Sequence, residues 1–190
     1  TCFGGDFSSP VPWLEEALTI SRQLRDYEDE GEALMIFGNL THWQGAYGQA
    51  STYYEDAILL SEKSWNHFQN LWAHIHLAYT ILRQDNIQQA RRLFTDSIHN
   101  THKAGMTIAL VFAVEGIASL NVNQNQPEHA AQLFAWADAM REKLGDTRPP
   151  VEQASVDKDL AVIHSKIDDT EFTHLSAEGR AMTMEQAIAL

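Results

Sequence analysis

The feature that most constrains this chain is a step of 40 residues at which small and aromatic side chains recur. A step of this length is typical of repeat proteins, in which each unit packs against its neighbours along the chain. Because one such unit cannot bury its apolar face alone, the step predicts a linear stack of similar units. Four series keep the step: Gly38, Ala78 and Ala118; Ala50, Ala90 and Ala130; Tyr54, Phe94 and Phe134; and Ala57, Ser97 and Ala137.

The same step extends towards the N-terminus and marks the turns. Leu14 and Ala17 fit the last two series, and Pro10 stands in the small-residue position before them. Another series consists of Gly, Asp and Asn, which tolerate the left-handed conformation that short helix connections often need. This turn series comprises Gly5, Gly45, Asp85 and Asn125, and the apolar series after it comprises Phe7, Tyr47 and Ile87 and ends at Pro127.

Each unit is predicted to be a hairpin of two antiparallel helices. Between Gly31 and Ser64, apolar side chains form one helical stripe before the turn at Gly45 and a second stripe after it. Small residues at 38 and 50 allow the two helices to approach closely, and the aromatic ring at 54 fills the space beside them. The expected fold class is therefore all-α: an α-α superhelix of antiparallel helical hairpins with a short helical C-terminal cap.

The step also divides the chain into repeats and a cap. Asp169 and Thr183 are expected to begin helices, and Thr183 with Gln186 has the pattern of a capping box. Residue 1 falls just before a turn, so the first helix of the opening repeat is missing, and we expect the chain to come from a larger protein. The expected divisions are a repeat region over 1–148, with a partial unit at 1–30 and units at about 31–70, 71–110 and 111–148, and a capping segment over 149–190.

These spacings resemble the tetratricopeptide repeat. Its pattern is a small residue, a turn, a second small residue, an aromatic and a third small residue, and it occurs here three times in register between about residues 2 and 144. The step departs from the common period of roughly 34 residues, and the extra residues lengthen the helices by about a turn and a half. The proline that often closes such a repeat is also missing. The first copy of the pattern is Gly38, Gly45, Ala50, Tyr54 and Ala57.

Repeats with this long period are similar to those in the C-terminal region of large bacterial multidomain regulators, the ATPases of the LuxR, maltose-activator and antibiotic-regulator kinds. The order of residues from Gln132 onwards, including Pro149 and Pro150, resembles the tail of many such regulators, some of which carry cyclase or kinase domains instead. The resemblance implies a cytoplasmic sensor or interaction module in signalling or transcription regulation. Such a module would act together with upstream domains of the parent protein.

Candidate partner-binding residues lie on the first helix of each hairpin, because the first helices of such a stack line its concave surface. Aromatic, Asn, His and Arg side chains suit this role, since Trp, Tyr and Arg often dominate binding energy. The alternative is that the aromatic members are simply buried between repeats. The candidates are Glu32, Met35, Asn39, His42, Trp43, Trp72, Tyr79, Arg83, Phe112, Glu115, Ser119 and Asn123.

Charge narrows the class of partner. The chain has 26 acidic and 13 basic side chains and a net charge of −13, so this segment is a poor binder of nucleic acid. Every lysine lies outside the first-helix faces, which disfavours the clamp for acidic peptide ends that the resemblance suggests. A protein or peptide that is basic or apolar fits better. The acidic run from Asp26 to Glu32 would attract a basic partner, although such runs are also typical of a solvated helix start.

The sequence carries no arrangement that indicates catalysis, a cofactor or a metal. It has no phosphate-binding glycine loop and no recognisable nucleophile motif, so we expect a non-catalytic protein. His74 and His76 are two positions apart and point to opposite sides of a helix. His99 and His102 could share an ion, but no typical metal-ligand spacing accompanies them.

Two alternative functions stay open beside protein or peptide binding in the groove. One is a small-molecule inducer receptor with a pocket formed by Trp43, Trp72 and Tyr79, which would require an enclosed aromatic cavity. The other is self-association, as a homodimer through the N-terminal helix at about 10–25. No apolar run is long enough to span a bilayer, and we expect a cytoplasmic location and no membrane partner.

Overall fold

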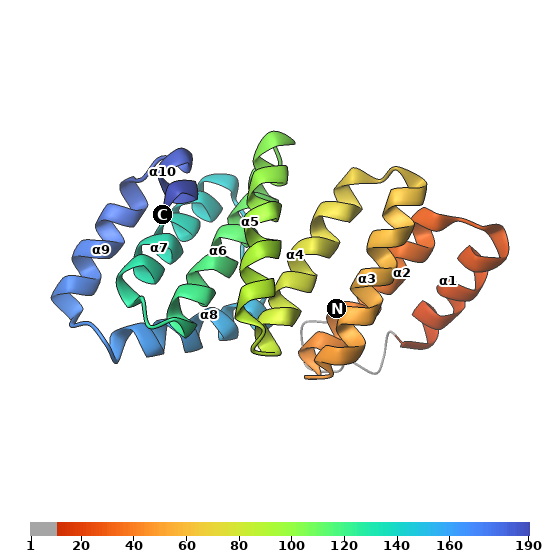
Figure 1. Cartoon of the computed structure of the whole chain (residues 1–190), viewed down its shortest axis with the longest axis horizontal. Coiled ribbons are helices and arrows are strands. Elements are labelled where there is room, and N and C mark those ends of the chain that lie inside the picture. The colour runs from red at the N-terminus through yellow and green to blue at the C-terminus, as the bar shows by residue number, and fades with distance from the viewer. Residues whose placement is uncertain (1–10) are drawn as a thin grey trace. The chain divides into compact units, whose positions relative to one another are not determined.

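The computed structural model describes residues 11–190, and within that range the chain forms helices and no strands (Figure 1). This confirms the prediction of an all-α fold of consecutively packed helices. The predictions for Gly5, Phe7 and Pro10 concern residues outside the described range. The helices are α1 (Val11–Leu24), α2 (Tyr27–Trp43), α3 (Tyr47–Ser64), α4 (His67–Arg83), α5 (Ile87–Lys103), α6 (Thr107–Asn123), α7 (Pro127–Leu144), α8 (Pro150–His164), α9 (Asp169–Ala181) and α10 (Met184–Ala189).

Each helix from α1 to α7 is followed by one residue with a positive φ, and these residues stand 20 positions apart. The predicted turn residues Gly45, Asp85 and Asn125 have φ values of 81°, 59° and 56°, which confirms the left-handed conformation. A second turn series lies between them and was not predicted, because two of its members are not residues that favour this conformation. The second series is Arg25, Trp65, Gly105 and Gly145.

The chain forms two compact halves, Thr1–Leu93 and Phe94–Leu190, with the boundary inside α5. In the N-terminal half, α1 to α4 lie side by side and each helix is antiparallel to the next (Figure 1). The contact between α2 and α3 is close, since a Cβ added to Gly38 would lie 2.5 Å from Cε1 of Tyr54. The core of this half comprises Leu34, Ala57, Leu60 and Ala73, with Leu18, Met35, Tyr53 and Ile58 packed against it.

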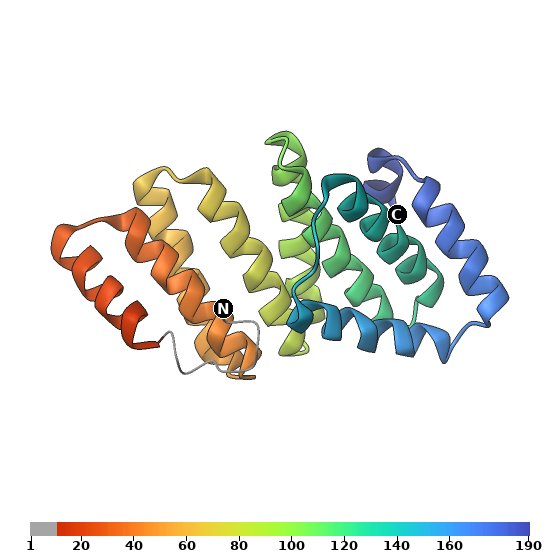
Figure 2. The same cartoon turned by 180° about the vertical axis from the view of Figure 1, so that it is seen from behind.

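In the C-terminal half, the same type of contact joins α5 and α6. A Cβ added to Gly116 would lie 2.1 Å from Cε1 of Phe94. Helix α9 packs along α7, where Gly179 approaches the carbonyl of Gln132, whereas α8 runs across α6 and α7 (Figure 2). Helix α10 begins with the predicted capping box at Thr183, and the N-cap of α9 is Asp168, one residue before the predicted start.

The left-handed turn at Trp65 leads to the first testable prediction. A side chain in this conformation costs about 1–2 kcal/mol, and a glycine there loses about 0.5–1 kcal/mol through the entropy of the unfolded chain. Because Trp65 is 79% exposed, little burial would be lost. We expect Trp65→Gly to raise the free energy of unfolding by about 0.5–1 kcal/mol, measured by urea titration.

The control is Gly145→Ala, which places a side chain at a φ of 66° and should lower the free energy of unfolding. A loss of stability in Trp65→Gly would show that the indole stabilises the fold instead of straining the turn.

Candidate functional site

Side chains from α2, α3 and α4 meet in the N-terminal half. They lie on the face formed by α2 and α4, the first helices of their hairpins, which we call the first-helix face. The hydroxyl of Tyr54 donates a hydrogen bond to Oδ1 of Asn39 over 2.7 Å. Nδ1 of His42 lies 2.8 Å from Oγ1 of Thr80, which connects α2 to α4. Two of the predicted partner-binding residues, Asn39 and His42, are therefore held in place by hydrogen bonds between helices.

A ladder of four aromatic rings runs along this face from solvent into the core, and we call it the ring ladder. Phe68, Trp72 and His76 stand one turn apart on α4, with ring centroids separated by 6.3 Å and then 5.9 Å. The ring of His76 stacks on that of Tyr54, with centroids 5.6 Å apart and planes 15° apart. Phe68 is 62% exposed and Tyr54 is 1% exposed, so the ladder offers one open end to solvent.

The histidines of this face are neutral at pH 7. Burial, together with the nearby His76 and Arg83, lowers the pKa of His42 to about 4. Burial also lowers the pKa of His76 to about 4. Burial raises the pKa of Tyr54, so its hydroxyl remains a donor. The ring ladder therefore presents uncharged rings. The faces of these rings suit apolar or aromatic groups and also attract cations.

An acidic side chain contacts the N-cap of α4, the helix whose first turn carries Phe68. Asn66, which caps α4 two residues before Phe68, donates a hydrogen bond from Nδ2 to the carboxylate of Glu28 over 2.8 Å. The acidic run also has a local role, because Asp26 accepts hydrogen bonds from the backbone N–H groups of Glu28 and Asp29. Carboxylates at a helix N-terminus are favourable in themselves. The position of the acidic run from Asp26 to Glu32 is therefore compatible with both interpretations, attraction of a basic partner and a solvated helix start.

The other predicted residues of this half differ in exposure. Met35 is half-buried against the core, while the charge of Arg83 acts on His42, as the lowered pKa of that histidine shows. The exposed members are Glu32 and Arg83, and the half-buried members are Met35, Asn39, His42, Trp43, Trp72 and Tyr79.

In the C-terminal half, the corresponding face of α6 is covered by the chain itself. Glu115 is 3% exposed, and Arg141 of α7 holds its carboxylate with two hydrogen bonds, from Nε over 2.8 Å and from Nη2 over 2.9 Å. Arg148, in the connection between α7 and α8, donates a further bond from Nε over 3.0 Å. Although burial opposes the charge of both guanidinium groups, Glu115 raises the pKa of each.

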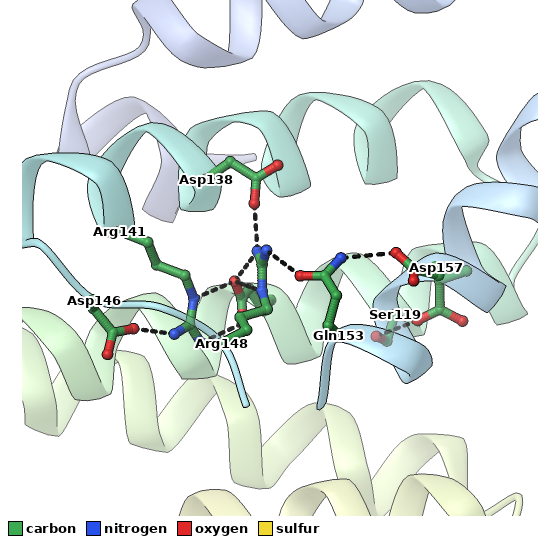
Figure 3. Close-up of polar contacts among 9 residues, drawn as sticks. Ser119, Asp138, Arg141, Asp146, Arg148, Gln153 and Asp157 are labelled. Carbon is green, nitrogen blue, oxygen red and sulfur yellow. Dashed lines mark hydrogen bonds and ion pairs between the residues drawn. The ribbon is translucent and has the colours of Figure 1, made fainter. Parts of the chain in front are cut away.

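Further acidic side chains surround this pair of arginines (Figure 3). Arg141 is also paired with Asp146, and Arg148 with Oδ1 of Asp138 over 2.5 Å. The guanidinium carbon of Arg141 lies 4.2 Å from the centre of the Phe112 ring. We call Glu115, Arg141, Arg148, Asp138 and Asp146 the buried ion network. An open pocket of about 470 Å³ lies over it, lined by Asp138, Arg141, Glu142, Gly145, Asp146, Thr147, Arg148 and Gln153.

Helix α8 completes the cover over α6. The hydroxyl of Ser119 donates a hydrogen bond over 2.6 Å to Oδ2 of Asp159 (Figure 3). Asn123 is exposed and bonds the backbone oxygen of Ser119. Three of the four partner-binding residues predicted on α6, namely Phe112, Glu115 and Ser119, therefore contact the chain's own α7, α8 or connecting segment.

Sequence reasoning missed the arginines of the buried ion network, although one signal pointed to them. Glu115 is the single charged residue of α6, a helix that is otherwise apolar or uncharged. A buried acid needs a counter-charge, so this residue indicates a basic partner somewhere in the fold. Arg141 and Arg148 follow 26 and 33 residues later, and no local pattern identifies either as that partner.

Glu152, near the start of α8, is the one described acid with a strongly raised pKa. Burial raises its pKa to about 7; Glu115 and Asp146 act in the same direction, and the two arginines oppose it. Its Oε2 is buried and has no hydrogen-bond partner. The protonation state of this side chain therefore changes near neutral pH.

Comparisons with family models, curated proteins and solved structures found no match to this chain. The resemblance to the tetratricopeptide repeat and to bacterial regulators therefore stays a prediction. Among residues 11–190, no group of three or more His, Cys, Asp or Glu is placed to hold a metal ion. Crossing a membrane would require a helix longer and more apolar than any in the same range.

The buried ion network gives a prediction about stability. Glu115→Gln keeps the shape of the side chain but leaves two buried arginines without their shared carboxylate. We expect the free energy of unfolding to fall by about 3–5 kcal/mol, measured by urea titration. The matched control is Glu142→Gln, which breaks the exposed pair between Glu142 and Arg180 and should have a much smaller effect. Equal losses in both variants would contradict the proposed importance of burial.

Glu152 gives a prediction about pH. The folded chain keeps a proton on this carboxyl up to a pH of about 7, whereas the unfolded chain releases it near the ordinary value of 4.5. Its contribution to stability is therefore complete below pH 4.5 and is lost as the pH rises to about 7. Relative to the wild type, Glu152→Gln should become increasingly stable over this interval, measured by urea titrations at several pH values.

Two comparisons support the assignment of that pH effect. His42 and His76 have lowered pKa values and so lose stability as the pH falls from 6.5 to 4, but they are present in both chains and cancel in the difference. Glu142→Gln should show no trend between pH 4.5 and 7, because Arg180 lowers the pKa of Glu142 and the contribution of this carboxylate to stability therefore changes only below pH 4.5. A difference that does not grow with pH would contradict the raised pKa of Glu152.

Proposed function

We propose that this chain is a non-catalytic helical-repeat scaffold that binds a protein or peptide on the first-helix face of its N-terminal half. In the parent molecule it would be the sensor or interaction module of a bacterial cytoplasmic signalling or transcription regulator. The partner is a segment that combines Lys or Arg with apolar side chains. The proposal rests on the following features of that face.

The ring ladder is the observation that carries the proposal. Aromatic residues presented on rigid helices bind with little loss of side-chain entropy and often dominate binding energy. Phe68 offers an open ring, while Trp72 and His76 behind it are held by stacking on one another and on Tyr54. A partner side chain that stacks on Phe68 would therefore extend an ordered array instead of ordering a mobile one.

A second exposed aromatic residue lies beside the ladder in the sequence. Trp65 is 79% exposed and has a φ of 57°, while the equivalent positions in later repeats are Gly105 and Gly145. Strained backbone conformations of this kind persist most often where function requires them. Trp65 and Phe68 both belong to the junction between α3 and α4, so two exposed aromatic side chains stand three residues apart there.

Charge determines which segment fits. Residues 1–64 contain 11 acidic and 3 basic side chains, a local charge of −8, which leaves −5 for the rest of the chain. Glu28 lies next to Asn66 at the open end of the ladder, and a Lys or Arg of the partner could contact both this carboxylate and an exposed ring. An acidic segment would be repelled.

Selection from a random peptide library against the immobilised full chain tests this function. We expect the selected peptides to be rich in Lys or Arg together with aromatic or aliphatic residues. Phe68→Ala should weaken their affinity about tenfold or more, measured by fluorescence anisotropy. The control is Leu59→Ala, which removes another exposed apolar side chain of the same half, 56% exposed on α3, and should leave affinity unchanged.

Trp65→Gly makes the test sharper because two opposite effects are expected. It should weaken peptide binding while it stabilises the fold, a combination that a purely structural residue would not produce. The proposed function is contradicted if the selected peptides are acidic, or if they bind Phe68→Ala as tightly as the wild type.

A further inference from the structure

Asn39 and His42 stand three positions apart on α2, so their side chains are neighbours on one face of that helix. Both are half-buried, and each uses one polar atom in a hydrogen bond to another helix. Oδ1 of Asn39 is bonded to the hydroxyl of Tyr54, and Nδ1 of His42 to that of Thr80. The second polar atom is Nδ2 in Asn39 and Nε2 in His42, and the protein's own hydrogen bonds determine what each can bind.

The hydroxyl of Thr80 determines which ring nitrogen of His42 carries a hydrogen. This hydroxyl has a single hydrogen atom, which it donates to the backbone oxygen of His76 over 2.9 Å. Towards His42 the hydroxyl can therefore only accept, so Nδ1 is the donor. Because a pKa of about 4 keeps His42 neutral at pH 7, its Nε2 carries a lone pair and is a hydrogen-bond acceptor.

Tyr54 fixes the opposite polarity at Asn39. Burial raises the pKa of Tyr54, so its hydroxyl keeps its hydrogen and donates it to Oδ1 of Asn39 over 2.7 Å. That bond orients the amide, and the NH₂ group on Nδ2 is left as a donor. Asn39 therefore offers a donor where His42, one turn further along α2, offers an acceptor.

Both atoms are open to solvent. Within residues 11–190, neither Nδ2 of Asn39 nor Nε2 of His42 has a hydrogen-bond partner. The buried side-chain atoms without a partner in this range belong to Gln69, Trp136 and Glu152. The first-helix face therefore carries an accessible donor and an accessible acceptor, and the side chains of both are held in place by bonds to other helices.

The charge near His42 favours a neutral group of the partner. Arg83 lies close enough to contribute to the lowered pKa of His42, so it would repel a Lys or Arg side chain from this acceptor. A main-chain N–H is a neutral donor, and an extended segment presents both C=O and N–H groups along its edges. Hydrogen bonds to the main chain give affinity that does not depend on the partner's sequence.

We propose that Asn39 and His42 bind the main chain of an extended partner segment. Nδ2 of Asn39 donates to a backbone C=O of the partner, and Nε2 of His42 accepts from a backbone N–H. This assignment rests on the proposed function, because it names the part of the peptide that is held beside the ring ladder. The peptide's side chains would then provide the sequence preference and its backbone a second set of contacts.

NMR of the histidine ring nitrogens in the full chain tests the tautomer. We expect His42 to carry its hydrogen on Nδ1 at pH 7, and the Nε2 resonance to shift when a peptide from the library selection binds. A free chain in which Nε2 carries the hydrogen would overturn the proposal, since His42 would then offer no acceptor.

Backbone N-methylation of the tightest selected peptide, one amide at a time, tests the bond to His42. We expect one site at which methylation weakens binding to the wild type about three- to tenfold but costs nothing in His42→Asn. The shorter Asn side chain can still bond Thr80 but does not reach the position of Nε2. Asn39→Asp keeps Oδ1 for Tyr54 and removes the donor, so it should weaken binding although an added carboxylate attracts a basic peptide.

The matched control is His74→Asn. His74 is also half-buried and also bonds through Nδ1, to the backbone oxygen of Asn70 over 2.8 Å, but it lies on the other side of α4 from His76. This variant should retain the methylation effect of the wild type, and its loss here would contradict the assignment to His42. Circular dichroism checks that all variants keep the helicity of the wild type.

Failure of this assignment can be distinguished from failure of the proposed function. If peptides bind in a manner that depends on Phe68, but methylation costs the same in the wild type and in His42→Asn, the assignment is overturned and the proposed function stands. Binding of Asn39→Asp that is as tight as that of the wild type would also overturn it. If no peptide is selected, or if binding does not depend on Phe68, both proposals are overturned.

Discussion

The close contact between a glycine on one helix and an aromatic ring on its neighbour is the constraint on which the arrangement of both halves depends. At Gly38 and at Gly116 even a methyl group would overlap the ring of Tyr54 or of Phe94. The hydroxyl of Tyr54, whose ring lies between Gly38 and His76, bonds Asn39. The contact that closes a hairpin therefore also holds the inner end of the ring ladder in place, so packing and the proposed binding surface have one physical origin.

The two halves use the same helix position for different purposes, and buried charge explains the difference. Helix α4 carries no Asp, Glu, Lys or Arg before Arg83, and the pKa of His76 is lowered to about 4, so the ring ladder remains an array of neutral rings. Helix α6 carries Glu115 at an equivalent depth, and a buried carboxylate is tolerated only with opposite charge and hydrogen bonds around it. Arg141 and Arg148 supply both, and the segment that carries Arg148 leads into α8, which then lies across α6.

The hairpins and one turn series could be predicted from the sequence because close packing requires the same kind of residue at the same place in every repeat. The buried ion network could not, since its members are paired across the fold and obey no repeat. The ring ladder was predicted only in part. Trp72 was a candidate, but Tyr54 was assigned to packing, and the one-turn spacing of Phe68, Trp72 and His76 was the signal that could have identified the rest.

The departures from the repeat gather in the N-terminal half, and this is the strongest argument for where a partner binds. The second turn series has unstrained glycines at 105 and 145 but Arg25 and Trp65 at a φ of 56° and 57°. The same half leaves Trp65 and Phe68 exposed, while the C-terminal half compensates its charges internally. Local strain and exposed aromatic surface both destabilise an isolated chain. The stability lost through the exposed rings is recovered when a partner covers them. The ring ladder of this half would gain stability on binding in this way.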